Sequence, residues 1–538
     1  MQPRLFAIAL PFLATTVVVA GTAAAVAAPM GPEDARHLLA RTGFGPTAAE
    51  VRAYALLPRE DAVAQLLAGV RTTPVTPPPS WAGETGPLRP ASLATATPDE
   101  RKAFVQEQVR RGLALRAWWL EEMLATPSPL TERMTLFWHN HFVSSQQKVR
   151  VARLMYEQNA LLRANALGNF GTLLHAASKD PAMVIYLDSV QNRKGAPNEN
   201  FAREVMELFT LGQGHYGEED VKEAARAFTG WSLERDTGTF VFRPRQHDDG
   251  AKTVLGRSGA FDGDAVLDLL LARPETSEFV VTKLWLEFVS PTPDEAEVRR
   301  IARAFRASNY DIKVAVGALL RSPAFWAPAQ RGTLVKGPVD LVVGTLRQLD
   351  LAPPDALPFA LLAAGMGQNL FAPPNVRGWP GGAAWINSNT LLARKQFLDR
   401  VARNDAGAPP PAGIAAMKPV TAGAAARDDG SMDAMAGAPA RPAAPAARDA
   451  AAAPRNAAVT DANGAAQRAA RAVDRGLRNL QFDPARWVAQ QDGATRDDKL
   501  RAARTLLLPI AAQTPVPSDA DARAAVYALL LDPAYQLR

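Results

Sequence analysis

The sequence contains no cysteine in 538 residues and only six histidines. The absence of cysteine excludes disulfides, thiolate zinc sites, haem attachment through CxxCH and cysteine nucleophiles. The sequence also lacks a Walker loop, a GxGxxG turn after a strand, a GxSxG elbow and an HExxH helix. These absences argue against nucleotide-binding, dinucleotide-binding and α/β-hydrolase functions.

The charge balance gives no sign of a nucleic-acid partner. The net charge is +6, from 60 Lys and Arg against 54 Asp and Glu, and the basic residues form no dense run. We therefore expect no nucleic acid. With 47% hydrophobic and 21% charged residues, the composition is that of an ordinary globular protein.

The first segment predicts export. Arg4 precedes a nearly continuous run of apolar or small residues over 5–28, and Ala25-Val26-Ala27 offers small residues for a peptidase. This pattern predicts a secretory signal peptide at 1–28 and a mature protein in the periplasm or outside the cell. The alternative is a retained membrane anchor, because ~20 apolar residues can span a bilayer. We expect no membrane span after cleavage, since no later run is long enough.

Helical periodicity dominates the rest of the chain. The sequence predicts an all-α fold, a large single helical domain with one small β-hairpin at 238–253, where Phe240-Val241-Phe242 lies among turn residues. Capping boxes at Thr47–Glu50 and Thr97–Glu100 mark two helix starts. We expect helices near 33–41, 48–57, 99–125, 131–143, 149–165, 199–211, 219–229, 263–272, 276–289, 293–307, 337–349 and 389–402.

A low-complexity stretch interrupts this pattern. Residues 405–467 are rich in Ala, Pro, Gly and Asp and contain almost no large apolar side chain. Such a segment buries too little surface to offset its ordering entropy, so it is predicted to be a long disordered insertion. The expected organisation is a helical domain at 29–404, this linker, and C-terminal helices at 468–538 that pack back on the main domain.

Two histidines lie close together in Trp138-His139-Asn140-His141-Phe142. Residues two apart on a helix point about 200° apart, so at most one of these rings faces a shared site. The functional interpretation is that His139 or His141 binds a divalent metal ion. The alternative is that both rings form hydrogen bonds inside the core.

Carboxylates cluster in the segment 198–208, NENFAREVMEL. On a helical wheel Asn200, Glu204 and Glu207 form a polar stripe beside an apolar one, with Arg203 next to Glu207. Carboxylates so close to a buried stripe need a partner, a proton or a metal. The segment is therefore either a general acid–base pair or a structural Arg–Glu network.

Two further segments combine unusual residues. His247, Asp248 and Lys252 lie in a loop that is either a catalytic or ion-binding turn, or an Asp-Gly turn with solvated charges. The loop 371–385 is rich in Gly and Pro and carries Trp379 and Trp385. Exposed Trp rings would suit stacking on sugars, whereas buried rings would suit a structural plug.

Ordered motifs in this chain resemble those of the bacterial domain-of-unknown-function 1800 family. They are HLLARTGFG at 37–45, the segment 137–143, NENFAREVMELFTLG at 198–212, EAARAFTGW at 223–231, HDDGAKTVLG at 247–256, 337–349, MGQNLFAPPNVRGWPGGAAW at 366–385 and DPAYQ at 532–536. The resemblance covers roughly 32–402 and 495–538. It implies a helical exported protein and a sulfatase-like partner of the domain-of-unknown-function 1501 family. It brings no established catalytic residues.

Two functions remain open from the sequence. The first is a hydrolase acting on carbohydrate or a cell-envelope polymer, in which His139 or His141 completes the site or holds one divalent metal ion. The second is a non-catalytic periplasmic partner or assembly factor for a sulfatase-like protein. The hydrolase hypothesis assigns catalysis to Glu204, Glu207, Arg203, His247 and Asp248, and substrate binding to Asn200, Lys252, Trp379 and Trp385.

Overall fold

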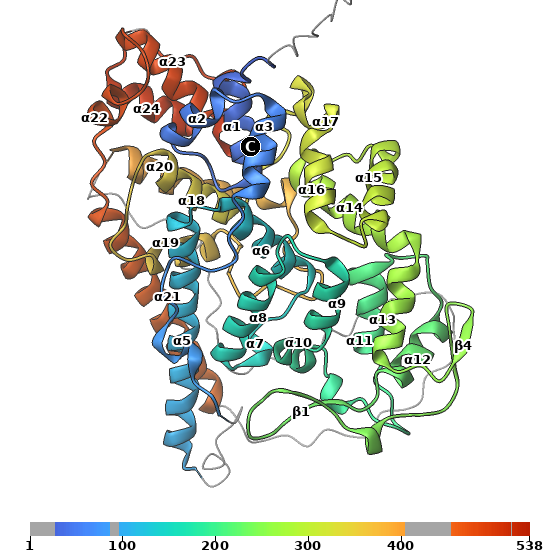
Figure 1. Cartoon of the computed structure of the whole chain (residues 1–538). Coiled ribbons are helices and arrows are strands. Elements are labelled where there is room, and N and C mark those ends of the chain that lie inside the picture. The colour runs from blue at the N-terminus through green and yellow to red at the C-terminus, as the bar shows by residue number, and fades with distance from the viewer. Residues whose placement is uncertain (1–26, 87–95, 404–452, 518) are drawn as a thin grey trace, which may run out of the picture.

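The computed structural model describes residues 27–86, 96–403, 453–517 and 519–538 (Figure 1). All but the last two residues of the predicted leader, 1–28, lie outside these ranges, as does 405–452 of the expected insertion. The described chain is helical apart from two small two-stranded antiparallel sheets, which confirms the all-α class. None of its helices is long and apolar enough to cross a membrane.

The first half of the chain forms the blue-to-green helices of Figure 1. They are α1 (Gly31–Thr42), α2 (Ala48–Ala55), α3 (Arg59–Ala68), α5 (Pro98–Ala125), α6 (Pro129–His141), α7 (Gln146–Val149), α8 (Ala152–Ala164), α9 (Phe170–Ser178), α10 (Pro181–Tyr186), α11 (Asn200–Glu204) and α12 (Glu218–Ala227). Both predicted capping boxes are present, at the starts of α2 and α5.

The second half continues with the green-to-red helices of Figure 1. They are α13 (Gly263–Ala272), α14 (Pro274–Phe288), α15 (Glu295–Ala307), α16 (Ile312–Arg321), α17 (Pro323–Trp326), α18 (Pro338–Gln348), α19 (Leu357–Gly365), α20 (Ser388–Arg403), α21 (Ala453–Asn479), α22 (Pro484–Ala489), α23 (Arg496–Leu507) and α24 (Ala522–Leu531). Because α21 begins at residue 453, the end of the expected linker is helical.

The strands form two hairpins where the sequence analysis expected one. β1 (Trp231–Leu233) pairs with β2 (Phe240–Phe242), and β3 (Lys252–Val254) pairs with β4 (Arg257–Gly259). The second hairpin closes through Leu255 and Gly256, at φ 52° and 76°. Two successive left-handed residues define a tight hairpin turn that the sequence pattern did not reveal.

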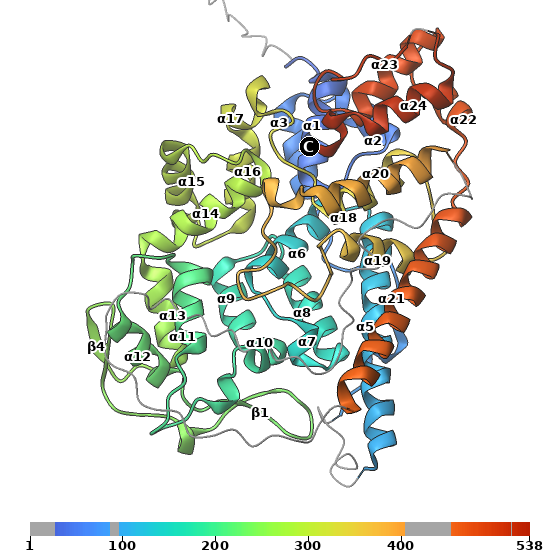
Figure 2. The same ribbon diagram turned by 180° about the vertical axis from the view of Figure 1, so that it is seen from behind.

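Two clusters of buried apolar side chains make up the core. One lies around α5, α18, α19 and the C-terminal helices, and the other lies around α6 and α8–α16. The helices α22–α24 lie beside α1 and α2, far away in sequence, and α23 contacts α1 (Figures 1 and 2). The long helices α5 and α21 both pack against α19.

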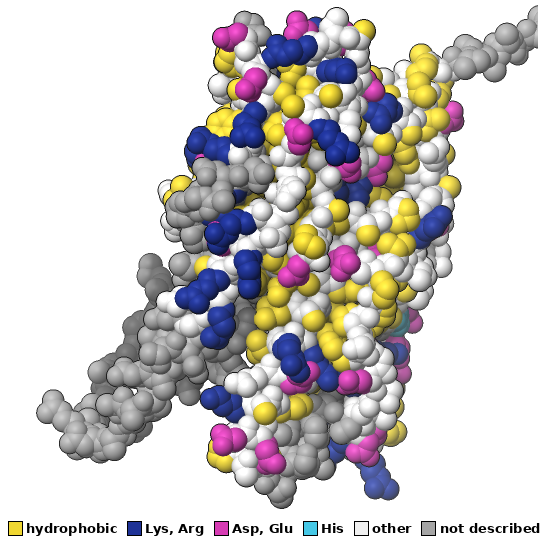
Figure 3. All heavy atoms as spheres, turned by 90° about the vertical axis from the view of Figure 1, so that its left-hand side faces the viewer, with side chains coloured by type: hydrophobic (Ala, Val, Ile, Leu, Met, Phe, Trp, Pro, Cys, Tyr) yellow, Lys and Arg dark blue, Asp and Glu magenta, His cyan; other side chains and the backbone are white. Residues whose placement is uncertain are grey.

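On the face in Figure 3, basic side chains are scattered among acidic and apolar ones.

Candidate functional site

The carboxylate motif lies where an α-helix changes into a π-helix. α11 ends at Glu204, and Val205–Thr210 follows as a π-helix. The Thr210 hydroxyl donates to the Val205 carbonyl, 2.5 Å away. Such wide turns are rare and are often found at functional sites.

Glu207 is held by three donors. Gln213 Nε2 and Arg377 Nη2 donate to Oε1 at 2.8 and 2.9 Å, and the Tyr216 hydroxyl donates to Oε2 at 3.1 Å. A carboxylate offers about four acceptor positions, so about one remains for water or substrate. The expected neighbour Arg203 pairs instead with Glu218 and Glu199, at 2.7 and 3.1 Å.

Glu204 has the opposite environment. Its side chain is half-buried, and none of the described residues donates a hydrogen bond to it. Burial, reinforced by the charge of Glu207, raises the pKa of Glu204 to about 7, although Arg377 and Arg203 oppose the shift. Neighbouring carboxylates in unlike environments are the usual arrangement for an acid and a base with different roles.

Asn200 lies one helical turn before Glu204. Its side-chain amide donates to the Leu187 carbonyl at 3.3 Å, and its backbone N–H is capped by Asn198 at 2.9 Å. Asn200 is half-buried and therefore helps to fix the start of α11 next to the carboxylates. No contact in the structure assigns it a substrate.

The two histidines of α6 face different surroundings. His139 is buried among the rings of Trp119, Phe371 and Trp379, each with its centroid 5.5 Å away. Its Nε2 has no hydrogen-bond partner, and burial lowers the pKa of His139 to about 3. His139 is therefore a neutral aromatic member of the core.

His141 instead pairs with a lysine. Its Nε2 lies 3.1 Å from the Phe209 carbonyl of the π-helix, and its Nδ1 lies 3.2 Å from Lys283 Nζ on α14. Lys283 Nζ also donates to the Leu208 carbonyl at 3.1 Å. Burial lowers the pKa of both groups, to about 8 for Lys283. These two side chains satisfy carbonyls at the end of the π-helix.

A pocket of about 440 Å³ opens beside this pair. Its walls come from α6, α14 and the loop at 377–385, and they include His141 and Lys283 but not His139. Arg377 also lines the pocket, and its ion pair with Glu207 links the pocket to the carboxylates. Glu204 and Glu207 are not themselves among the residues that line the pocket, so the carboxylates connect to it only through Arg377.

The aromatic loop is fixed against α6. Asn140 Oδ1 accepts the backbone N–H of Trp379 at 2.7 Å, and Gly378 adopts φ +83°. A Cβ at Gly378 would lie 2.2 Å from that same oxygen, so the close approach requires glycine. Trp379 and Trp385 are 4% and 7% exposed. Burial of both rings favours the alternative that they form a structural plug. Both residues also line the pocket.

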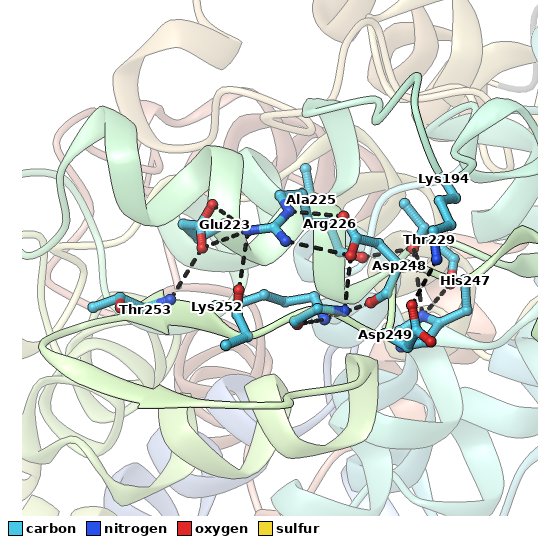
Figure 4. Close-up of polar contacts among 12 residues, drawn as sticks. Lys194, Glu223, Ala225, Arg226, Thr229, His247, Asp248, Asp249, Lys252 and Thr253 are labelled. Carbon is cyan, nitrogen blue, oxygen red and sulfur yellow. Dashed lines mark hydrogen bonds and ion pairs between the residues drawn. The ribbon is translucent and has the colours of Figure 1, made fainter.

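The His247 turn is a separate, closed network (Figure 4). Asp248 pairs with Arg226 at 2.8 Å, and this contact lowers the pKa of Asp248 to about 2. His247 Nδ1 lies 2.9 Å from the Thr229 carbonyl. Lys252 is 1% exposed and donates to the backbone carbonyls of residues 248 and 250. In the described chain, no hydrogen bond or ion pair joins this turn to Glu204, Glu207 or either histidine of α6.

The geometry gives no support to the predicted metal ligands. Among the described residues, no group of three or more His, Asp or Glu side chains is placed to hold a metal ion. His139 and His141 do not converge, and the Lys283 ammonium lies at His141 Nδ1. Helix spacing predicted that at most one of the two rings faces a shared site. Of the two, only His141 lines the pocket.

Sequence reasoning missed the two basic residues of this site. Arg377 lies 170 positions from Glu207, inside a motif in which the tryptophans drew attention. Lys283 lies among the apolar residues of 279–288, and a lone lysine in such a helix was the only signal. Neither assignment follows from spacing along the chain.

Comparison with known proteins gives one result. A protein-family model described as "Protein of unknown function (DUF1800)" matches residues 37–537. No curated protein and no solved structure matches the chain significantly.

Proposed function

The chain belongs to the DUF1800 family of proteins of unknown function, and we propose that it is a hydrolase in which Glu204 and Glu207 form the acid–base pair. The observation that carries this proposal is the contrast between the two carboxylates. Glu204 lacks donors and has a pKa raised to about 7. Glu207 accepts three hydrogen bonds, one of them from a guanidinium.

The chemistry follows from this contrast. Protonated Glu204 donates its proton to the leaving oxygen, and ionised Glu207 removes a proton from the attacking water. Water thus adds across the broken bond, and the proton gained by Glu207 restores Glu204 through solvent. Gln213 and Arg377 are exposed, so water reaches this side of the pair.

We propose carbohydrate or a cell-envelope polymer as the substrate and the periplasm or cell exterior as the location. The leader-like segment 1–28 supports export. Paired carboxylates are the common machinery of glycoside hydrolysis. The role assigned earlier to Arg203 passes to Arg377, because Arg377 makes the ion pair with Glu207.

Reducing ends released from purified cell-wall sacculi and from a panel of polysaccharides test this function. We expect release by the wild type and a 10²–10⁴-fold lower kcat for E204Q, as for loss of a general acid. The matched control is E219Q, since Glu219 is exposed and pairs only with Lys222. Equal rates for wild type and E204Q, or no release from any polymer, would contradict the proposal.

A second proposal is a non-catalytic role as periplasmic partner or assembly factor of a sulfatase-like protein. The closed Arg226–Asp248–Lys252 network favours it, because a motif with its donors and acceptors satisfied within the chain suits a scaffold. Native extraction from the periplasm distinguishes the two. A stable complex without release of reducing ends would support the partner role, and a monodisperse active monomer would oppose it.

A further inference from the structure

The pocket beside His141 has an excess of positive charge. Together with a small cavity behind it, it is lined by the basic residues Arg36, Arg133, Lys283, Lys336, Arg377 and Arg538, and by the acids Glu287 and Asp340. The two acids are shared between Arg133 and Arg538. When Arg377 is assigned to Glu207, the basic residues left without a carboxylate are Arg36, Lys283 and Lys336, and of these only Lys283 lines the pocket itself.

Lys283 is the clearest case. In the described part of the chain, no carboxylate lies within ion-pair distance of its ammonium group. An ammonium group has three donors. Two of them reach the Leu208 carbonyl and His141 Nδ1, and the Phe279 ring centroid lies 4.8 Å from the ammonium nitrogen. No oxygen or nitrogen of the described residues accepts the third donor.

Other buried donors around the pocket also lack partners. Arg133 Nε, Trp379 Nε1 and Arg538 Nε have no hydrogen-bond partner, and neither does Lys336 Nζ in the cavity behind. All four are N–H groups. Among the described lining residues, no buried acceptor is left unsatisfied in the same way. These four N–H groups are buried out of contact with solvent, so they favour an anion in the pocket through their electric field and not through direct hydrogen bonds.

We propose that this pocket binds an organic oxyanion, a small molecule whose carboxylate, sulfate or phosphate group accepts the remaining donor of Lys283 and is attracted by the surrounding basic residues. Its volume of about 440 Å³ falls within the range of small-molecule sites. Phe137 and Trp385 line the same space and offer apolar surface to the body of the ligand. The proposal does not require Glu204 to act as an acid, since binding needs only the donors.

Isothermal titration calorimetry on the full chain at fixed ionic strength tests this site. The probes are glucuronate and glucose, which share a ring and differ in the carboxylate, and inorganic sulfate and phosphate with chloride as reference. We expect glucuronate to bind at least about tenfold more tightly than glucose. Tighter binding of sulfate or phosphate than of glucuronate identifies a sulfate or phosphate ester as the natural group.

Two pairs of variants locate the binding. Leu286 lines the pocket and is 42% exposed, so its substitution leaves the core intact. L286E adds a negative charge at the pocket and should weaken glucuronate binding about threefold or more, whereas L286Q should not. K283Q should weaken it about tenfold, whereas K222Q, on an exposed ion pair, should not.

The outcomes separate this proposal from the catalytic one. Saturable glucuronate binding that survives E204Q supports the oxyanion site whatever the activity of that variant. The proposal is overturned if no anion binds better than chloride, if glucose binds as tightly as glucuronate, or if L286E and L286Q bind equally. The L286 pair decides the question even if K283Q fails to fold.

Discussion

Replacing Glu204 with glutamine should stabilise the protein in a pH-dependent way. Burial raises the pKa of Glu204 from its ordinary 4.5 to about 7. Between these values the unfolded chain releases this proton and the folded chain keeps it. Stability contributed by the raised pKa is therefore present at low pH and is lost as pH rises from about 4.5 to 7. Glutamine does not ionise and avoids that loss.

The size of the effect follows from the same shift. Fully expressed, a pKa change of this size is worth ~3 kcal/mol. Glu204 is only half-buried, so solvent screening reduces the expected gain to about 1.5 kcal/mol. In a chain of this length that free energy corresponds to roughly 2 °C in Tm.

Calorimetric Tm values of wild type and E204Q at pH 4.5 and pH 8 measure this gain. The difference between the proteins at pH 8 should exceed the difference at pH 4.5 by about 2 °C, and E219Q should show no such change. The comparison across pH removes any constant effect of the amide. A Tm difference between wild type and E204Q that is the same at both pH values would refute the reasoning.

Three other substitutions should all destabilise. E207Q weakens the ion pair with Arg377 and should lower the free energy of unfolding by about 1–3 kcal/mol in urea titrations at pH 7; a stabilised variant would contradict the assignment. K252M removes a buried ammonium group that donates to two carbonyls of the turn, so urea titration should show a loss of about 1–3 kcal/mol in the free energy of unfolding. No loss would show that the turn is solvated instead. G378A places a Cβ against Asn140 Oδ1 at φ +83°, so a loss of roughly 1–3 kcal/mol in the free energy of unfolding, seen as a lower Tm, and altered tryptophan fluorescence are expected; an unchanged Tm would disprove the tight approach.

Local signals in the sequence predicted much of the helical framework. Both capping boxes form as expected, since Thr47 and Thr97 accept hydrogen bonds from the N–H groups of Glu50 and Glu100. The 99–125 segment is the long α5, which begins at Pro98. Capping chemistry and apolar periodicity act over a few residues, so they can be recognised without knowledge of tertiary contacts.

The site was predicted only in part, because its partners come from distant elements. The carboxylates were identified from their position beside an apolar stripe. The expected contact between Arg203 and Glu207 does not form, because Arg203 pairs with Glu199 and Glu218 and Glu207 pairs with Arg377. Arg377 approaches from a loop 170 residues away, and periodicity carries no information about such a contact. The π-helix and the loop path depend on tertiary packing, which a helical wheel does not represent.

For the His247 turn, the sequence located the residues but could not tell what they do. Its composition fitted both a catalytic loop and a structural turn, and only the contacts distinguish them. Arg226 pairs with Asp248, and Lys252 is buried beneath the backbone it supports. Residue types alone do not reveal whether charged groups face a substrate or one another.

A raised pKa of Glu204 beside the hydrogen-bonded Glu207 carries the proposed acid–base function. Difference infrared spectroscopy of wild type against E204Q, from pH 5 to pH 9, observes the C=O stretch of a protonated carboxyl directly. In the wild-type-minus-E204Q difference we predict a band that disappears with a midpoint near pH 7, and the E219Q-minus-E204Q difference should show the same band. Burial raises the pKa of Asp180 to about 7 as well, but its band is common to both proteins and cancels in the difference. A midpoint at the ordinary glutamate value, or no such band in the difference, would contradict the account.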